Sequence, residues 1–330
     1  MEYGMAKKGS PKKPARKGAK KKRGRGLGLF CLFLFVAATL AAGFYFMFLY
    51  PGKQPGTPLP LLSGQSKHKP LRQKTEPPSG QSAPLYEEPA LPHQAPPVAT
   101  RPKKSAKKAL TGNPRVAIVI DDMGYRQNTG KALVALDLPL SFAFLPFTPF
   151  SGELQQEAKA KGCDILLHLP LEPMDPKAHP GQGALTTAMD QEAMKDRFRE
   201  DLHAVPQAIG VNNHMGSRFT ADPQAMRTLL AMVRTRGLFF LDSVTAANSA
   251  AYDLAREVGV KTERRTVFLD NDQNPDKIMA QLDLLVRLAT EHGQAVGIGH
   301  PYPATVEALR RYQTQLRTRT EMVGVSRLVH

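Results

Sequence analysis

Cysteine and tryptophan are the rarest residues of this chain: two cysteines and no tryptophan occur among its 330 residues. Two cysteines cannot form a disulfide framework, so a small cross-linked scaffold is excluded. Cys31 lies inside an apolar run, and Cys163 just precedes the apolar residues 165–167, so Cys163 is most simply a buried thiol. The lack of tryptophan removes a common side chain for stacking on sugar rings.

Acidic residues are scarce in the first 113 positions. Residues 1–26 contain 11 Lys and Arg against one Glu, and residues 51–113 contain 10 against three. Residues 114–330 are nearly neutral, with 24 basic and 25 acidic residues. The net charge of +16 therefore belongs to the N-terminal segments. A nucleic-acid-binding domain would need a basic folded face, so we expect no nucleic-acid partner.

A long uncharged run, residues 27–50, follows the basic segment. As a helix it is about 36 Å long, enough to cross a hydrocarbon layer of about 30 Å. A cleaved secretory signal has a shorter apolar core, and here the run continues past the weak candidate cleavage site at residues 41–43. We therefore expect a single uncleaved anchor in the inner (cytoplasmic) membrane. Residues 1–26 would be a disordered cytoplasmic tail, and everything after residue 50 would be periplasmic.

Proline marks the next segment. Residues 51–113 contain 13 of the 28 prolines and show no apolar periodicity, which predicts a disordered linker. Such a linker has an r.m.s. span of roughly 45 Å as a flexible coil. Residues 114–330 are the part of the chain that can bury a core, and we expect them to form one domain.

Apolar strand-like runs alternate with helix-like segments along residues 114–330. Asp222-Pro223 and Asn274-Pro275 are each typical of an N-cap followed by proline in the first turn of a helix. Repeated βα units predict a parallel sheet, and about seven units favour a small or incomplete barrel. We expect strands at 116–120, 138–147, 164–168, 208–212, 238–241, 260–263 and 295–299, and helices at 129–136, 153–161, 190–203, 223–236, 247–258, 274–292 and 304–316.

Residues 116–124, V-A-I-V-I-D-D-M-G, form the stretch around which the domain is organised. A continuous apolar run is typical of a strand buried on both faces, and the carboxyl ends of such strands carry the chemistry of α/β folds. Neighbouring residues of a strand point to opposite sides, so Asp121 and Asp122 can act together only if the chain turns there. Gly124 permits a turn. One Asp alone would be as consistent with a helix N-cap, but two crowded carboxylates indicate a cation or a catalytic site.

Titratable residues follow several other predicted strands. One histidine at such a position is more often structural than a ligand, but several together with carboxylates indicate zinc or another divalent transition metal. Asp270 and Asp272 are interpreted as a polar loop with an Asx-type turn. The residues at the strand ends are Asp121, Asp122, His168, His214, Asp242 and His300.

The order I-D-D-M-G, H-L-P-L-E-P, N-N-H-M-G-S-R-F-T, L-D-S and I-G-H-P resembles the divergent polysaccharide deacetylase family. That family is a remote branch of the metal-dependent polysaccharide deacetylases. The resemblance covers residues 114–330 and not the anchor or linker. It implies a distorted (β/α) barrel of about seven strands.

The resemblance also implies roles for individual residues. Asp121 matches the catalytic base, Asp122 and His168 match metal ligands, and His300 matches the general acid. The main family has H-x-x-x-H where this chain has Glu172 in the second histidine's place. The third ligand is then Glu172 or His214. We favour His214, because Pro170 disturbs the helical i, i+4 spacing that Glu172 would need.

Further polar residues near these motifs are assigned supporting roles. Asp242 is expected to orient a histidine through a hydrogen bond. Asn212, Asn213 and Arg218 are expected to position a sugar or to stabilise an oxyanion. A structural polar turn is an equally good interpretation of the two asparagines.

The sequence thus predicts a membrane-anchored hydrolase that removes N-acetyl groups from a cell-envelope polysaccharide, with a divalent ion, preferably zinc, as cofactor and an N-acetylated glycan as partner. The alternative is a non-catalytic envelope protein that uses the barrel to bind glycan or a protein partner. The altered H-x-x-x-H motif and the missing tryptophan favour the alternative, whereas Asp121 and His300 favour the enzyme. A metal phosphoesterase is less consistent, because no glycine-rich phosphate cradle is evident.

Overall fold

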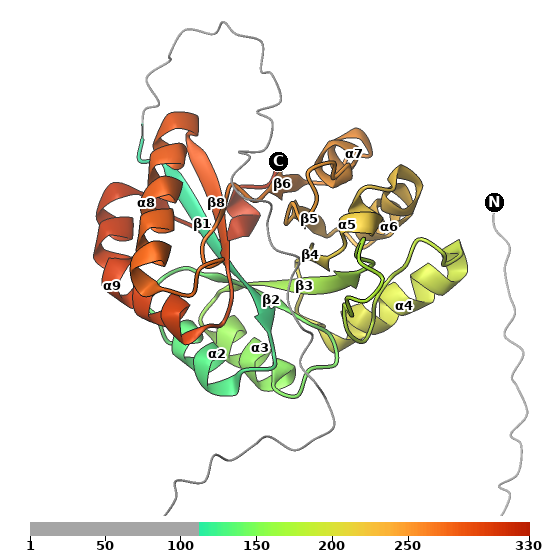
Figure 1. Cartoon of the computed structure of the whole chain (residues 1–330), viewed down its shortest axis with the longest axis horizontal. Coiled ribbons are helices and arrows are strands. Elements are labelled where there is room, and N and C mark those ends of the chain that lie inside the picture. The colour runs from blue at the N-terminus through green and yellow to red at the C-terminus, as the bar shows by residue number, and fades with distance from the viewer. Residues whose placement is uncertain (1–111) are drawn as a thin grey trace, which may run out of the picture. The chain divides into compact units, whose positions relative to one another are not determined.

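The computed structural model describes residues 112–330 (Figure 1). The predicted tail, membrane anchor and nearly all of the linker lie outside these residues. Among the helices of residues 112–330, none is both long and apolar enough to cross a membrane.

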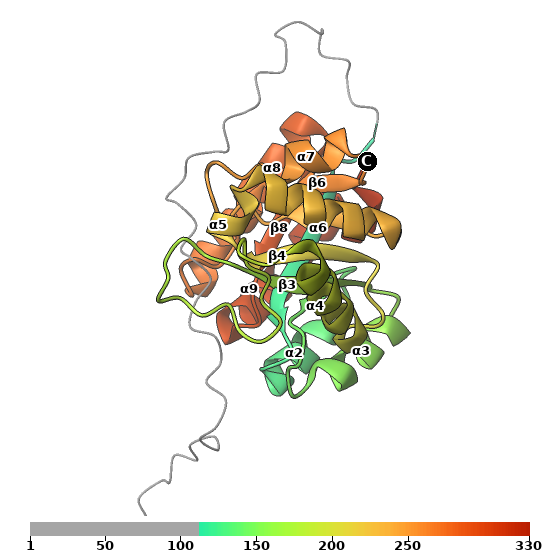
Figure 2. The same cartoon turned by 90° about the vertical axis from the view of Figure 1, so that its right-hand side faces the viewer.

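Parallel strands form one sheet in the order β6-β5-β4-β3-β2-β1-β8-β7, with β9 also paired to β1. Helices lie around the outside of this sheet (Figures 1 and 2). The strands are β1 (Arg115–Met123), β2 (Ser141–Phe144), β3 (Asp164–Leu171), β4 (Gly210–Met215), β5 (Phe239–Asp242), β6 (Thr262–Arg264), β7 (Val267–Phe268), β8 (Gln294–Gly299) and β9 (Glu321–Met322). The helices are α2 (Gln127–Val134), α3 (Ser151–Ala160), α4 (Gln191–Ala204), α5 (Ser217–Thr220), α6 (Pro223–Thr235), α7 (Ala251–Glu257), α8 (Pro275–His292) and α9 (Pro303–Arg319).

The sheet is strongly curled. Strands β6 and β7 stand at opposite ends of the strand order, yet only Arg265 and Thr266 separate them in the sequence. Because so short a connection spans at most about 10 Å, the two edges of the sheet must approach each other. The result is an incomplete parallel barrel, which confirms the predicted class of fold.

Each central strand is buried on both faces, and its residues alternate between two apolar clusters. In β1, Val116, Ile118 and Ile120 pack in a large cluster with the helices. Ala117 and Val119 belong to a second cluster, which consists of strand residues and the segment 323–328 and lines the inside of the curl. The burial of both faces explains why the strands are apolar without a gap.

Most predicted elements are present with shifted ends. Asp222 and Asn274 cap α6 and α8 as predicted, each accepting hydrogen bonds from two backbone N–H groups. The strand predicted at 138–147 is much shorter, since β2 contains four residues before the chain turns through a Pro-containing loop. The short strands β7 and β9 were not predicted, so the sheet formed by residues 112–330 has nine strands rather than about seven.

Candidate metal centre and active site

The carboxyl end of β1 is irregular at the paired aspartates. The pairing of β1 with β2 shifts register between Ile120 and Met123, and Asp122 has a left-handed backbone with φ 53°. In a regular strand Asp122 would face the helices, opposite to Asp121. The left-handed turn instead brings its carboxylate beside the histidines on the inner side of the curl. The chain does turn at this point, as the paired carboxylates require.

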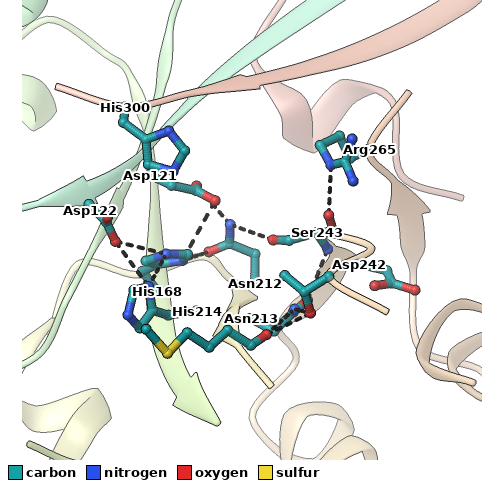
Figure 3. Close-up of polar contacts among 12 residues, drawn as sticks. Asp121, Asp122, His168, Asn212, Asn213, His214, Asp242, Ser243, Arg265 and His300 are labelled. Carbon is teal, nitrogen blue, oxygen red and sulfur yellow. Dashed lines mark hydrogen bonds and ion pairs between the residues drawn. The ribbon is translucent and has the colours of Figure 1, made fainter. Parts of the chain in front are cut away.

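Asp122, His168 and His214 bring three donor atoms together (Figure 3). The Asp122 Oδ1 atom lies 3.3 Å from His168 Nε2 and 3.0 Å from His214 Nδ1. The two ring nitrogens lie 3.1 Å apart. Both histidines are buried, and Asp122 is partly exposed, so the cluster is reached from the carboxyl edge of the sheet.

This triangle of donors fits one divalent ion. Ligands held about 2.1 Å from zinc lie about 3.4 Å apart at tetrahedral angles and about 3.0 Å apart at right angles. The observed separations of 3.0, 3.1 and 3.3 Å fall at this spacing. Two imidazoles and one carboxylate are also a donor set that catalytic zinc and other divalent transition metals take.

Asp122 carries the negative charge that such a centre requires. Burial opposes ionisation of this carboxyl group. The charge of His214, the close contacts of Asp122 with His168 and His214, and the charge of His300 outweigh burial, so the pKa of Asp122 is held well below its usual value. Asp122 is therefore a carboxylate at neutral pH.

His300 comes from the end of β8 and points toward Asp121 (Figure 3). Its ring Nδ1 lies 2.8 Å from Asp270 Oδ1, and its backbone N–H donates to Asp270 Oδ2 at 2.6 Å. The Thr305 hydroxyl donates to the same oxygen at 2.6 Å. Asp270 does lie in a loop after β7, but its interpretation as a residue outside the site was wrong, because its buried carboxylate holds the catalytic candidate His300. Asp272 is exposed and stays a loop residue.

Glu172 does not join the donor cluster. Its Oε2 accepts hydrogen bonds from the backbone N–H and hydroxyl of Thr187, both at 2.7 Å, and its Oε1 lies 3.7 Å from Arg218 Nε. Residues 168–171 are strand and not helix, so Glu172 lies about 13 Å along the extended chain from His168. The geometry thus favours His214 over Glu172, for a different reason from the one the sequence suggested.

Asp242 has a different role from the one predicted. Its carboxylate accepts hydrogen bonds from Val244 N–H at 2.8 Å and from the Ser249 hydroxyl at 2.9 Å, and it is turned away from the histidines (Figure 3). The neighbours Phe239 and Leu241 belong to the inner cluster, so Asp242 falls on the helix-facing side of β5. Burial raises its pKa, against these hydrogen bonds and the charge of Arg265. Asp242 anchors the loop after β5 and orients no histidine among the described contacts.

The two asparagines of β4 separate into two roles. Asn213 donates to the Met215 carbonyl and the Thr245 hydroxyl and accepts from Ser243 N–H, so it ties β4 to the loop after β5. Asn212 instead faces the site, where its amide contacts His168 and Asp121. Arg218 is exposed beside Glu172. Sequence reasoning did not find the contacts of Asn212, although its alternate position with His214 along the strand was a signal.

Known proteins resemble this chain in sequence and in structure. A model of the divergent polysaccharide deacetylase family matches residues 118–329. An uncharacterized protein of Haemophilus influenzae is 37% identical over 214 residues, covering 65% of this chain and 76% of that protein. The uncharacterized protein YibQ of Escherichia coli is 36% identical over 216 residues, covering 66% of this chain and 67% of that protein. The crystal structure of an uncharacterized Agrobacterium tumefaciens protein matches with a TM-score of 0.63 and 30% identity, covering 67% of this chain and 91% of that one.

Proposed function

The chain belongs to the divergent polysaccharide deacetylase family, and from this premise we propose that it is a metal-dependent hydrolase that removes N-acetyl groups from a polysaccharide of the cell envelope. The observation that carries the proposal is the triangle of Asp122, His168 and His214 donors with Asp121 and His300 beside it. One carboxylate and one imidazole outside the donor set are the groups that amide hydrolysis needs for moving protons.

Asp122, His168 and His214 would hold the ion, and zinc is our preferred identity for it. When bound there, a divalent ion polarises the acyl oxygen and lowers the pKa of water. Three protein donors leave room for water and substrate, whereas structural zinc sites usually have four protein ligands.

Asp121 is the group we assign as general base. Its side chain is fully buried, and its Oδ1 accepts a hydrogen bond from the Asn212 amide at 2.8 Å. A carboxylate held this way keeps a fixed direction and can take the proton from the water that attacks the acetyl carbon. Asp121 lies next to a donor residue but outside the donor triangle, so binding of the ion leaves it available as a base.

His300 is the group we assign as general acid. Asp270 takes up its Nδ1–H, so Nε2 is the ring nitrogen that would hand a proton to the leaving amine. Asp270 is itself fixed by Thr305 and by the His300 backbone, which limits the ring to one orientation. Attack of water and protonation of nitrogen then release acetate and leave the sugar amine.

We also propose that the domain acts outside the cytoplasm on an N-acetylated envelope glycan. The basis is the sequence alone: a basic segment of residues 1–26 before an uncharged run of 24 residues. The linker would let the domain reach glycan at some distance from the membrane.

Acetate release from an N-acetylglucosamine oligomer tests this function. The parent protein with added zinc should release acetate, and Asp121→Ala should reduce the rate by roughly 10²–10⁴-fold while the ion stays bound. His300→Ala should reduce the rate in the same way. Asp122→Ala, His168→Ala or His214→Ala should each remove most of the bound metal, whereas the control Glu172→Ala should retain it.

A different pattern would support the non-catalytic alternative. The parent would then release no acetate from several N-acetylated glycans with several metals, and Asp121→Ala would leave glycan or partner binding intact. Acetate release that Asp121→Ala does not reduce would contradict the assignment of Asp121 as the base, although the protein would still be a deacetylase.

A further inference from the structure

Asn212 lies between the donor cluster and the proposed base, and both ends of its amide are engaged (Figure 3). Its Oδ1 lies 3.0 Å from His168 Nδ1, and its Nδ2 donates to Asp121 Oδ1 at 2.8 Å. The Ser243 hydroxyl is a third contact, 3.3 Å from Nδ2. The side chain is fully buried, so these contacts do not compete with bulk water.

The orientation of the amide follows from the chemistry of its neighbours. An ionised carboxylate only accepts hydrogen bonds, so the Asn212 atom facing Asp121 must be the NH₂ group. The opposite orientation would set the amide oxygen against a carboxylate oxygen. With Nδ2 on Asp121, the carbonyl oxygen faces His168, and an oxygen acceptor requires a proton on His168 Nδ1. The lone pair of His168 is then on Nε2, the atom that faces Asp122 and His214.

The sheet makes this arrangement rigid. His168 and Asn212 are direct partners in the pairing of β3 with β4. Strands β4 and β1 are not neighbours in the sheet, so the bond from Asn212 to Asp121 crosses the inside of the curl. The Asn212 side chain on β4 therefore joins His168 on β3 to Asp121 on β1.

We propose that Asn212 is a positioning residue that fixes the metal-binding tautomer of His168 and the direction of the Asp121 carboxylate together. The second half rests on the proposed function, because Asp121 is the base only in a deacetylase. The first half concerns metal binding and stands without any catalytic activity. Partners that hold the second ring nitrogen of a ligating histidine are typically worth 10- to 100-fold in metal affinity.

Asn213 is a matched control on the same strand. It is as deeply buried as Asn212 and also uses both ends of its amide. Its partners are Met215, Thr245 and Ser243, on the helix-facing side of β4. Asn213→Ala therefore removes a buried asparagine of equal burial without touching His168 or Asp121.

The role of Asn212 in metal binding by His168 is tested in full-length protein that carries Asp121→Ala. This background removes the carboxylate, which lies 3.8 Å from His168 Nδ1 and could replace a lost amide oxygen. Adding Asn212→Ala should weaken zinc binding by roughly 10- to 100-fold. It should also shift the ring-nitrogen NMR signals of His168 in metal-free protein away from the Nδ1–H form. Adding Asn212→Asp should preserve both properties, because a carboxylate still accepts from Nδ1–H, and adding Asn213→Ala should also preserve them.

The role of Asn212 in fixing the direction of the Asp121 carboxylate is tested with Asn212 variants of the parent protein. A crystal structure of Asn212→Ala should show the Asp121 side chain in a different rotamer, while Asn213→Ala should leave it in place. With saturating zinc, Asn212→Asp should lower kcat by roughly 10- to 100-fold with little change in KM, since it replaces a donor by a second carboxylate. Circular dichroism verifies that each variant is folded.

The outcomes are separable. Equal zinc affinity with and without Asn212→Ala, or equal loss in Asn212→Asp and Asn212→Ala, would overturn the role at His168. An unmoved Asp121 in the Asn212→Ala crystal structure would overturn the role at the carboxylate. A parent protein that releases no acetate refutes the proposed function, but leaves the zinc, NMR and crystallographic results to decide the positioning role.

Discussion

Replacing Asp201 by asparagine should stabilise the protein at neutral pH, although it alters a fully buried residue. Asp201 lies in α4 and is 0% exposed, and neither of its carboxylate oxygens has a hydrogen-bond partner among the described residues. The backbone of Gly183 packs against it so closely that a Cβ there would lie 2.2 Å from Oδ1. A charge in this position has no compensation from water or from a donor.

Burial therefore raises the pKa of Asp201 from 3.8 to about 8, with Arg197 opposing and Glu200 adding to the shift. Because the carboxyl pKa is higher in the folded state, its stabilising effect is complete below the unfolded pKa and is lost as the pH rises toward the folded pKa. Between those values the unfolded chain ionises and the folded chain does not. Each pH unit then lowers the free energy of unfolding by about 1.4 kcal/mol, which amounts to about 4 kcal/mol at pH 7.

Asparagine does not titrate, so Asp201→Asn removes this loss. Urea denaturation at several values between pH 4 and pH 7 should show nearly equal stability of parent and variant at pH 4. The variant should gain about 1.4 kcal/mol per pH unit over the parent, up to about 4 kcal/mol.

Asp196→Asn is the matched control on the same helix. Asp196 is exposed and pairs with Arg199 at 2.9 Å, so its replacement should change stability by less than about 0.5 kcal/mol. A difference between parent and Asp201→Asn that stays constant with pH would refute the reasoning. A variant less stable than the parent at pH 7 would refute it as well.

Two further predictions concern the turn after β1 and the topology of the chain. Gly124→Ala should lower the free energy of unfolding by about 3 kcal/mol or more, because the φ angle of Gly124 is +120° and a Cβ would lie 1.9 Å from Thr148 Oγ1. The control Gly152→Ala should raise the free energy of unfolding by about 0.5 kcal/mol, because a Cβ there meets nothing within 4 Å. Equal effects of the two substitutions in a denaturation assay would contradict the prediction for Gly124. A reporter active only in the cytoplasm, fused after residue 113, should be silent, since residues 1–26 are basic and precede the uncharged run; an active reporter would reverse the orientation and exclude an extracytoplasmic glycan as substrate.

Much of the fold could be predicted because it is local. A continuous apolar strand, an Asp-Pro or Asn-Pro helix start and the alternation of the two depend on neighbouring residues, and α6 and α8 begin where these signals lie. The short strands β7 and β9 had no such signal, because two residues are too few to show a period. Their existence depends on the strands beside which they lie.

The chemistry of the site was also readable as residue types at strand ends. Asp122, His168 and His214 were named from the sequence, and the structure brings their donor atoms together. Asp270 was missed because its importance comes from His300, 30 residues away, and the residues near it resemble an ordinary polar loop. A carboxylate in a loop and a carboxylate holding an imidazole have the same local sequence.

The sequence by itself determined which residues have the chemistry for a metal centre and that parallel strands would carry them to one edge. The tertiary structure decided which side of each strand faces the inside of the curl. Strands buried on both faces have no polar alternation, so the sequence alone did not predict that Asp242 faces the helices. Asn212 can be separated from Asn213 only through its alternate position with His214, once His214 is known to face the inside of the curl. The left-handed backbone of Asp122 was also decided there, because the bulge in β1 depends on its pairing with β2. Side-chain direction alternates with every residue, so a site assembled across several strands depends on register, which only the packed sheet fixes.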